Sequence, residues 1–486
     1  MNIPYDFAIR TKQWLRDEYV LLEHALQDES PVSIRVNPSK KAISVTGLEK
    51  VGWCDTGYYL PERPSFTFDP LFHAGCYYVQ EASSMFLEQA VKQCIYGDAM
   101  NHHPVVCLDL CAAPGGKSTH LQSLLPAKSL LVSNEVINNR ASVLKENLTK
   151  WGSPYTIVTQ NDPKEIGKLT YLFDVIVADL PCSGEGMFRK VPDSRNEWSV
   201  DNVKLCAARQ RRIIHDVWES LKPGGFLIYS TCTFNREENE ENIRYIIEHL
   251  GAEALPVSVE TGWNISGSVD ESFPAYRFYP HHVKGEGFFL ALLRKSETVI
   301  KTSPCPLRRG ISAFCPPSEG KSAFCPPLEG VGGGQTCVCH FKEWLSDPDD
   351  FYFDIKQNRI RAIPVLYQDT FRLLSNYLRI LSAGVLMGEI KGKDFVPLPA
   401  LALNTFFRDD AFPSVELTWE ESIRYLQKET LVLPSTIPNG YVVVKYRNTP
   451  LGFVKNIGSR ANNLFPGEWR IRTSPPALSK REELFE

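Results

Sequence analysis

The chain has 486 residues, of which 43% are hydrophobic and 23% are charged, and its net charge is −4. This is the ordinary profile of a soluble protein of two to four domains, and it excludes an overall basic surface, so any nucleic-acid binding must come from local patches. No apolar run approaches the about 20 residues that cross a bilayer, and charges stand where a signal peptide would be apolar. We therefore expect a cytoplasmic protein whose 13 cysteines are mostly reduced.

The first 104 residues mix short strands with helical patterns. The segment 33–40, SIRVNPSK, predicts a strand that runs into a turn. The segment 81–94, EASSMFLEQAVKQC, has apolar residues at helical spacing and predicts an amphipathic helix.

Residues 105–298 follow a different pattern, in which short apolar runs alternate with helical stretches. Strands are predicted over 105–110, 129–136, 155–160, 173–180, 224–231 and 287–294. Helices are predicted over 139–152 and 206–225. Continuous apolar strands separated by helices indicate a buried, mostly parallel sheet covered on both faces, so we expect an α/β, Rossmann-like fold.

The first of these strands ends in the glycine turn CAAPGGKST, residues 111–119. Its end resembles a loop that grips nucleoside triphosphates, but such a loop needs glycine where Cys111 stands. Pro114 also removes a backbone N–H from the row that would hold phosphate. The turn is better suited to another ligand, which would approach the backbone at Gly115 and Gly116 and lie outside the carboxyl ends of the strands.

Acidic residues follow the next three strands at the same edge. Glu135 ends the second strand, where a carboxylate binds ribose hydroxyls, and Asp162 ends the third, where it can meet an adenine amino group. Asp179 ends the fourth. One such acid is often only a helix cap, but three in register with a glycine turn indicate a cofactor site. A ribose and an adenine without phosphates to hold favour S-adenosylmethionine.

Two cysteines follow the fourth and fifth strands at this edge. Cys182 stands in Asp179-Leu-Pro-Cys182, and Cys232 stands in Ser230-Thr231-Cys232-Thr233. A thiolate that attacks carbon 6 of a pyrimidine makes carbon 5 nucleophilic enough to take a methyl group. The alternative is two small apolar core residues, a common place for cysteine. The spacing alone does not choose which thiol would be the nucleophile.

Basic residues near these motifs suggest a path for an RNA backbone, which 209–212 slightly favours, and a charged helix face is the alternative. They are Arg189, Lys190, Arg209, Arg211 and Arg212.

The segment 299–340 is low in complexity, with the repeat SAFCPPSEGK/SAFCPPLEG, and is expected to be a linker. Its cysteine spacings match no common zinc pattern, so no metal site is predicted. The cysteines concerned are Cys305, Cys315, Cys325, Cys337 and Cys339.

The tail, 341–486, returns to a globular pattern, and 440–466 predicts short strands in a small β-rich module. Basic residues there alternate with aromatic ones, a pattern that suits base stacking and phosphate contact as well as it suits an ordinary β-surface. They are Lys445, Arg447, Lys455, Arg460, Arg470 and Arg472, with Tyr446, Phe453 and Trp469.

Taken together, these motifs resemble the RNA cytosine-C5 methyltransferases, the Sun-like family, over about residues 1–295. The tail is similar to the subgroup that acts on bacterial small-subunit ribosomal RNA and ends in a PUA-like RNA-binding module. The motifs are RVN (35–37), YVQEASSM (78–85), DLCAAPGGKS (109–118), DLPCSGEGMFRK (179–190), YSTCTFNREENE (229–240) and GEGFFLALLRK (285–295).

The resemblance implies a role for each site residue. It makes Cys232 the nucleophile and Cys182 the residue that helps product release, whereas DNA cytosine methyltransferases use the cysteine at the position of Cys182. Asp179 is placed near the methionine part of the cofactor or the base. The implied S-adenosylmethionine site consists of Cys111, Ala112, Ala113, Pro114, Gly115, Gly116, Lys117, Glu135, Arg140, Asp162 and Asp179.

The resemblance also implies a division into domains and a partner. We expect an N-terminal RNA-binding extension (1–104), a catalytic domain (105–298), the linker (299–340), an intermediate domain (341–415) and a PUA-like RNA-binding domain (416–486). The expected partner is ribosomal RNA or the small ribosomal subunit, bound by a monomer. Transfer RNA as substrate, a DNA methyltransferase and a non-catalytic ribosome-assembly factor are the alternatives.

Overall fold

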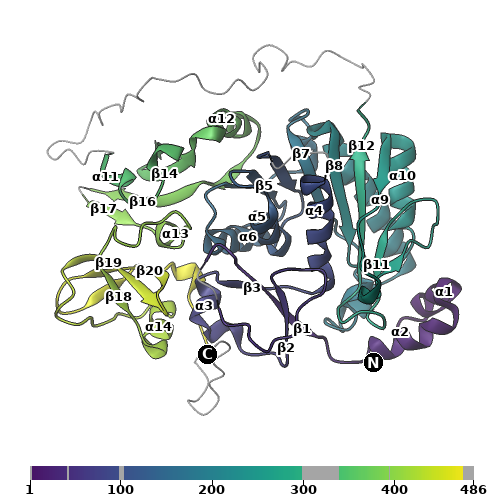
Figure 1. Ribbon diagram of the computed structural model, residues 1–486, viewed down its shortest axis with the longest axis horizontal. Coiled ribbons are helices and arrows are strands. Elements are labelled where there is room, and N and C mark those ends of the chain that lie inside the picture. The colour runs from purple at the N-terminus through teal and green to yellow at the C-terminus, as the bar shows by residue number, and fades with distance from the viewer. Residues whose placement is uncertain (1–2, 41–42, 98–102, 298–338, 393, 474–486) are drawn as a thin grey trace.

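The computed structural model describes residues 3–40, 43–97, 103–297, 339–392 and 394–473. A large central sheet carries the N-terminal helices α1 and α2 at one side and the C-terminal domains at the other (Figure 1). Within the described ranges, no helix is long and apolar enough to cross a membrane. The predictions made for Cys305, Cys315, Cys325 and Cys337 lie outside the described residues.

The N-terminal part consists of two short helices and a small antiparallel sheet in the order β2-β1-β3. The strand and turn expected over 33–40 are confirmed by β1, whereas the helix expected over 81–94 begins as the 3-10 turn η3 and continues as α4. The elements are α1 (Tyr5–Leu15), η1 (Arg16–Glu18), α2 (Tyr19–Ala25), β1 (Val32–Val36), β2 (Gly57–Leu60), α3 (Pro70–His73), β3 (Tyr77–Val79), η3 (Ser83–Phe86) and α4 (Leu87–Tyr96).

The central sheet has ten strands in the order β10-β11-β12-β8-β7-β4-β5-β6-β15, with β9 paired to β12. The five strands from β8 to β6 are parallel, which confirms the predicted fold class, and β12 runs antiparallel to β8. The strands are β4 (Val106–Asp109), β5 (Leu130–Asn134), β6 (Thr156–Thr159), β7 (Phe173–Asp179), β8 (Leu221–Thr231), β9 (Ala252–Leu255), β10 (Ser266–Gly267), β11 (Tyr276–Phe278), β12 (Phe288–Lys295) and β15 (Ile380–Ala383).

Both faces of this sheet are buried, because neighbouring residues of each strand point to opposite faces and nearly all are apolar. Leu131 packs with α4 and α5 on one face, while Leu130 and Val132 pack with α9, α10 and α12 on the other. The helices are α5 (Gly116–Leu124), α6 (Asn138–Trp151), α7 (Pro163–Ile166), α8 (Ser194–Glu197), α9 (Val200–Val217), α10 (Glu240–Leu250) and α12 (Gln368–Tyr377).

The helix predicted over 206–225 is wrong at both ends. Helix α9 begins at Val200, where Ser199 caps its first turn, and ends at Val217. Residues 221–225, with Pro223 among them, belong to β8, in which Leu221 pairs with Phe173 of β7 and regular pairing resumes at Phe226 after an irregularity. The apolar residues of 213–221 fit a helix or a strand equally well, so periodicity alone did not show where one ended and the other began.

The C-terminal part contains two four-stranded sheets, β13-β14-β16-β17 and β18-β19-β20-β21. Between the strands of the first, the chain returns to the central sheet, where β15 pairs antiparallel with β6. The elements are α11 (Cys339–Lys342), β13 (Phe351–Lys356), β14 (Arg359–Pro364), β16 (Val385–Lys391), β17 (Asp394–Pro397), α13 (Pro399–Ala402), β18 (Ser414–Glu416), α14 (Trp419–Leu426), β19 (Gly440–Tyr446), β20 (Thr449–Asn456) and β21 (Ala461–Asn463).

The two ends of the chain share one hydrophobic cluster. The N-terminal sheet and α3 lie beside α14 and the last sheet (Figure 1), and buried side chains from both sides pack together. The N-terminal members include Ile34, Leu60, Leu71 and Tyr77, and the C-terminal members include Leu417, Ile423, Leu426, Val442 and Phe465.

Candidate active site at the carboxyl ends of the parallel strands

The glycine turn lies directly after β4 and leads into α5. Gly115 has a φ of 113°, a conformation that favours glycine, and Gly116 is the first residue of the helix. Side chains from α6 fix the turn, since Arg140 Nη2 donates to the carbonyl of Ala113 at 2.8 Å and Asn147 donates to that of Pro114 at 2.8 Å. The turn is therefore held from outside through its carbonyl groups.

Lys117 joins the glycine turn to the end of β7. Its Nζ lies 2.8 Å from Asp179 Oδ2, and Ser230 Oγ at the end of β8 donates to Asp179 Oδ1 at 2.8 Å. Burial by itself would lower the pKa of Lys117, but attraction by Asp179 outweighs it and raises the pKa. Lys117 is thus a fixed cation beside Asp179, and the two residues predicted for the site are brought together.

Glu135 lies just beyond β5 and is 4% exposed. Its Oε1 accepts the N–H of Ile137 at 3.0 Å, and Arg140 Nη1 lies 3.6 Å from Oε2. That Oε2 is buried and has no hydrogen-bond partner among the described residues. A buried carboxylate oxygen without a donor is uncommon, and a ligand hydroxyl is one group that would satisfy it.

Asp162 lies at the end of β6, as predicted, but it is exposed. Its Oδ1 accepts the N–H of Lys164 at 3.0 Å and caps the short helix α7. Asn134 fixes the neighbouring strand ends, because it donates to Leu110 and Asn161 and accepts from Thr159. Asp162 therefore has a structural role already, and its other oxygen is the one open to a ligand.

Asp109, the last residue of β4, was not singled out from the sequence. It is fully buried, its Oδ2 accepts from Ser118 Oγ at 2.6 Å, and its Oδ1 has no partner among the described residues. Burial raises the pKa of Asp109 to about 7. The signal that could have found it is the motif DLCAAPGGKS, in which it is the first residue.

The two predicted thiols face each other across the edge of the sheet. The Sγ atoms of Cys182 and Cys232 are 3.1 Å apart, both residues are partly exposed, and neither forms a disulfide. Interaction with Cys232, together with burial, raises the pKa of Cys182 well above its usual value. The two sulfur atoms are therefore in direct contact at the edge of the sheet.

A buried polar network holds the loops that carry the thiols. Glu185 accepts the N–H groups of Phe234 and Asn235, each at 2.8 Å, and the indole N–H of Trp198 at 3.0 Å. The N–H of Gly186 also donates to the carbonyl of Cys232 at 2.9 Å. These bonds tie the loop after β7 to the loop after β8.

Glu238 is the second acid of this network. It accepts from the N–H of Ser183 at 3.1 Å, from Asn235 at 2.8 Å and from Gln210 at 2.7 Å. Burial raises its pKa to about 7. Neither Glu185 nor Glu238 received a role from the sequence, although both lie inside the quoted motifs, because an acid two or more positions from a thiol gives no sign of what it contacts.

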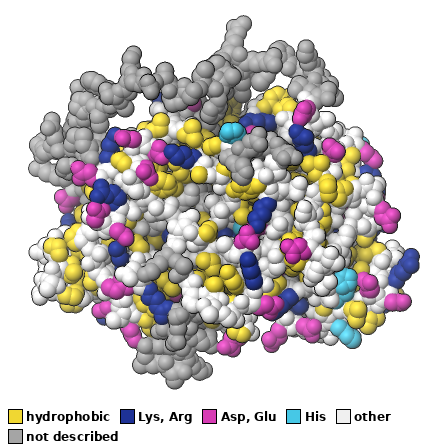
Figure 2. Space-filling model, viewed as in Figure 1, with side chains coloured by type: hydrophobic (Ala, Val, Ile, Leu, Met, Phe, Trp, Pro, Cys, Tyr) yellow, Lys and Arg dark blue, Asp and Glu magenta, His cyan; other side chains and the backbone are white. Residues whose placement is uncertain are grey.

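One of the basic residues near the site is not available for the RNA path that the sequence suggested. Arg189 is buried, since its Nε lies 3.1 Å from Glu286 and its guanidinium also donates to backbone carbonyls. Arg211 donates to Asn242 at 2.6 Å. Lys190, Arg209 and Arg212 are exposed. On the face shown in Figure 2, basic and acidic side chains are interspersed.

The aromatic residues proposed for base stacking in the C-terminal module are mostly core residues. Phe453 is fully buried and Tyr446 is 8% exposed, so neither offers a face to a base. Trp469 is half-buried against Phe465, with Lys150 above its ring. Arg460, Arg470 and Arg472 are exposed. The alternating pattern of 440–466 reflects the two faces of a strand pair.

Comparison with known proteins covers most of the chain. A family model described as 16S rRNA methyltransferase RsmB/F matches residues 99–294. Models of the N-terminal domain of 16S rRNA methyltransferase RsmF and of the methyltransferase RsmF PUA domain match residues 3–82 and 412–471. A methyltransferase homolog protein from Pyrococcus horikoshii is 28% identical over 60% of this chain and 94% of that chain, with a TM-score of 0.49.

Two curated relatives extend over almost the whole length. The ribosomal RNA small subunit methyltransferase F of Aliivibrio fischeri is 30% identical, and the alignment covers 90% of each chain. The protein of the same name from Escherichia coli is 30% identical over 90% of this chain and 89% of its own. The chain belongs to the family of the ribosomal RNA small subunit methyltransferase F.

Proposed function

We propose that the protein methylates carbon 5 of a cytosine in 16S ribosomal RNA, with S-adenosylmethionine as the methyl donor and Cys232 as the nucleophile. The observation that carries this proposal is the pair of thiols 3.1 Å apart beside the Lys117–Asp179 ion pair. The names of the relatives support RNA of the small ribosomal subunit as the substrate.

The residues at the strand ends fit the proposed cofactor. Glu135 Oε2, which has no hydrogen bond and lies 3.6 Å from Arg140, is an acceptor for a ribose hydroxyl, and the open oxygen of Asp162 is an acceptor for an amino group. The turn 111–117 offers backbone N–H groups without the row that a phosphate needs, and Arg140 supports it from outside. When bound, S-adenosylmethionine would supply an electrophilic methyl group.

The proposed chemistry begins at Cys232. Its thiolate forms a bond from Sγ to carbon 6 of the cytosine, and the electrons of the 5,6 double bond move into the ring, where an acid near N3 supports them. Carbon 5 is then nucleophilic. Asp179, held by Lys117 and Ser230, is the carboxylate placed at this edge to orient the base.

Release of the product requires loss of the proton on carbon 5. When carbon 5 loses its proton, the electron pair of that C–H bond re-forms the 5,6 double bond, and the bond between carbon 6 and Cys232 Sγ breaks to release a thiolate. We propose that Cys182 is the base that accepts this proton. Its pKa is raised first by Cys232, and this cause disappears once Cys232 is bonded to carbon 6, so Cys182 ionises more readily at the step where a base is needed.

The test is methylation of 16S ribosomal RNA with labelled S-adenosylmethionine, followed by identification of 5-methylcytosine. Absence of the product on both naked RNA and small subunits would refute the proposal. Transfer RNA and DNA serve as competing substrates, and preference for either would correct the substrate class.

The thiols are tested by trapping. Cys232→Ala should abolish turnover, whereas Cys182→Ala should accumulate a covalent protein–RNA adduct on a denaturing gel. Cys206→Ala, which removes a thiol from α9 outside the pair, is the matched control and should do neither. An adduct that accumulates in the Cys232 variant alone would reverse the two assignments.

A further inference from the structure

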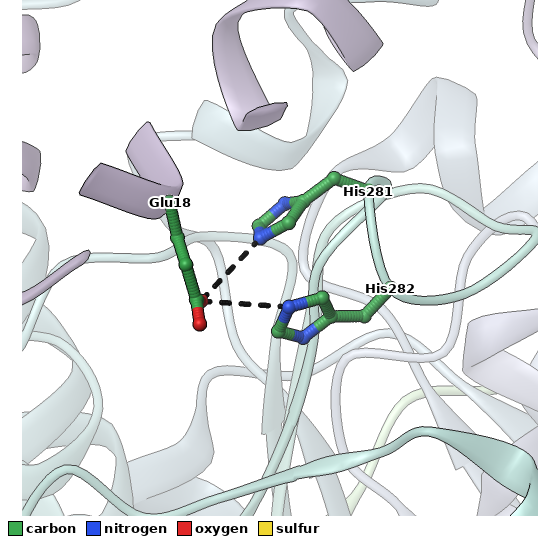
Figure 3. A group of neighbouring side chains, drawn as sticks. All are labelled: Glu18, His281 and His282. Carbon is green, nitrogen blue, oxygen red and sulfur yellow. Dashed lines mark ion pairs between the residues drawn. The ribbon is translucent and has the colours of Figure 1, made fainter. Parts of the chain in front are cut away.

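Glu18, His281 and His282 form a side-chain cluster between the N-terminal helices and the catalytic domain. Glu18 is the last residue of η1, and the two histidines follow β11 in the loop before β12. Glu18 Oε2 lies 3.9 Å from His281 Nε2 and 3.5 Å from His282 Nε2. In Figure 3 the carboxylate points at the two imidazoles, which approach it from neighbouring positions of one loop.

His281 is the unusual member of this cluster. Its side chain is 3% exposed, yet neither of its ring nitrogens has a hydrogen-bond partner among the described residues. A buried imidazole is normally hydrogen-bonded, because an unmet donor or acceptor costs about 1–3 kcal/mol.

His282 is oriented by a second hydrogen bond. Its Nδ1 lies 2.9 Å from Ser266 Oγ, which leaves Nε2 directed at Glu18. Histidines that bind metals are commonly fixed in this way, because a bond at one ring nitrogen sets the tautomer and the direction of the other.

The spacing of the three ligand atoms fits a single ion. All three lie within 4.8 Å of one another. Imidazole nitrogens and carboxylate oxygens bind Zn²⁺ at about 2.0–2.2 Å, which places two ligands of a tetrahedral site about 3.3–3.6 Å apart. Direct hydrogen bonds would draw the atoms closer than the 3.5 and 3.9 Å observed.

We propose that Glu18, His281 and His282 bind a divalent transition-metal ion, Zn²⁺ in the first instance, and so fasten the N-terminal helices to the catalytic domain. Two imidazoles and one carboxylate are a common zinc donor set, and the half-exposed side of Glu18 leaves a fourth position open to water. The spacing rules could not reveal this site, because more than 250 residues separate Glu18 from the histidines.

A second group of possible ligands makes a useful contrast. Cys54, Glu88 and His120 are also close together, but His120 Nε2 already lies 3.1 Å from Glu88, and Lys92 is paired with the same carboxylate at 2.7 Å. All three ligand residues are fully buried. His120 Nε2 and the Glu88 carboxylate are therefore already paired, although His120 Nδ1 has no hydrogen bond, so this group is the weaker candidate for an ion.

The proposed metal ion would lie where the N-terminal helices already pack against the catalytic domain. Phe7 of α1 packs against Phe188 and Trp198 of the catalytic domain, and Arg10 pairs with Glu237. A metal ion at Glu18 adds a bond at the turn between α1 and α2. Its binding therefore stabilises the docked N-terminal helices and is independent of methyl transfer.

The experiment measures metal uptake by the full-length protein. The chain is stripped with a chelator, dialysed against Zn²⁺, and its bound zinc is counted by mass spectrometry. Glu18→Gln and His282→Asn are the test variants, since both side chains are partly exposed and folding is checked by circular dichroism. His249→Ala, which removes an exposed imidazole on α10, is the matched control.

We expect the wild type and the control to hold one more zinc ion per chain than either test variant. Co²⁺ in place of Zn²⁺ should give a spectrum without a thiolate charge-transfer band for this ion, which separates it from metal bound by cysteines. Zinc should also raise the thermal midpoint of the wild type more than that of the variants. Equal zinc content in all four proteins would overturn the proposal, and so would a cysteine-type spectrum for the ion that the variants lose.

Discussion

A single unsatisfied oxygen is the most informative detail of the cofactor region. Glu135 keeps one carboxylate oxygen bonded to the backbone of Ile137 and leaves Oε2 buried without a hydrogen bond. A group held ready in this way costs the folded protein stability, and a ligand that donates to it recovers the loss. The charge of Glu135 therefore matters more for binding of the ligand than for folding of the protein.

The first prediction follows from that oxygen. Glu135→Gln keeps an acceptor for Ile137 but removes the charge, so the affinity for S-adenosylmethionine should fall about tenfold or more, the effect of losing a charge-assisted hydrogen bond of about 1.5–3 kcal/mol. Isothermal titration calorimetry measures it. Glu165→Gln, an exposed change on α7, should bind as the wild type does, and an unchanged affinity in Glu135→Gln would place the ribose elsewhere.

Asp109 supports a prediction on pH. Its pKa is raised from 3.8 to about 7 by burial, so the folded state binds this proton more tightly than the unfolded state. The stability it contributes is complete below about pH 4 and is lost as the pH rises through 7. Between pH 5 and pH 8 the thermal midpoint of the wild type should fall more than that of Asp109→Asn.

The control for this pH effect is Asp201→Asn, because Asp201 is 90% exposed. Its midpoint should follow the wild type at every pH. Parallel curves for Asp109→Asn and the wild type would mean that Asp109 is ionised in the folded protein at pH 5. The pKa of Glu238 is also raised to about 7, so Glu238 lowers stability with rising pH in the same direction. It does so in every variant and does not affect the comparison.

Individual residues divide into those that the sequence could place and those that it could not. Cys182, Cys232 and Asp179 end parallel strands, and strand ends meet at one edge, so their proximity follows from the order of the strands. Arg189 was misjudged, because its partner Glu286 comes from a loop almost a hundred residues away. A local pattern carries no information about which distant side chain will neutralise a charge.

At the scale of elements, β15 is the least expected part of the fold. It comes from the C-terminal half of the chain, pairs with β6, and leaves the sheet at Gly384, whose N–H donates to Thr156. Its short sequence, Ile380–Ala383, is partly exposed and resembles many surface strands. The parallel strands were predictable because each is a continuous buried apolar run, whereas an edge strand has no such signature.

Gly384 offers a test of this junction. Its φ is 58°, and an added Cβ would lie 2.2 Å from the carbonyl oxygen of Ala362, so Gly384→Ala should shift the backbone and lower the thermal midpoint by several degrees. Gly392→Ala is the matched control, since its φ is 63° but the space around it is open. A drop no larger than the control's would mean that the contact between Gly384 and Ala362 adapts easily.

For the whole molecule, the shared cluster between the two chain ends is the main tie. The N-terminal sheet buries Ile34 and Tyr77 against Leu426 and Val442 of the last domain. Burial of such side chains contributes roughly 1.5–3 kcal/mol each. The terminal domains are thus parts of one folded unit rather than separate attachments.

Truncation tests this dependence. A chain that ends at residue 297 loses the C-terminal half of the cluster and uncovers the edge of β6, so it should elute largely as aggregates in size-exclusion chromatography. A chain that ends at residue 473 keeps every described contact and should elute as the full-length protein does. A stable, monodisperse 1–297 fragment would contradict the interpretation.

The same cluster has a consequence for synthesis. Ile34 leaves the ribosome about 390 residues before Leu426, which at roughly 5–20 residues per second is a delay of about 20 to 80 seconds. Throughout that interval the apolar face of the N-terminal sheet lacks its C-terminal partners and packs only with residues such as Leu71 of α3. Completion of the first domain therefore waits for the last one, and until then the newborn chain is exposed to aggregation and to chaperones.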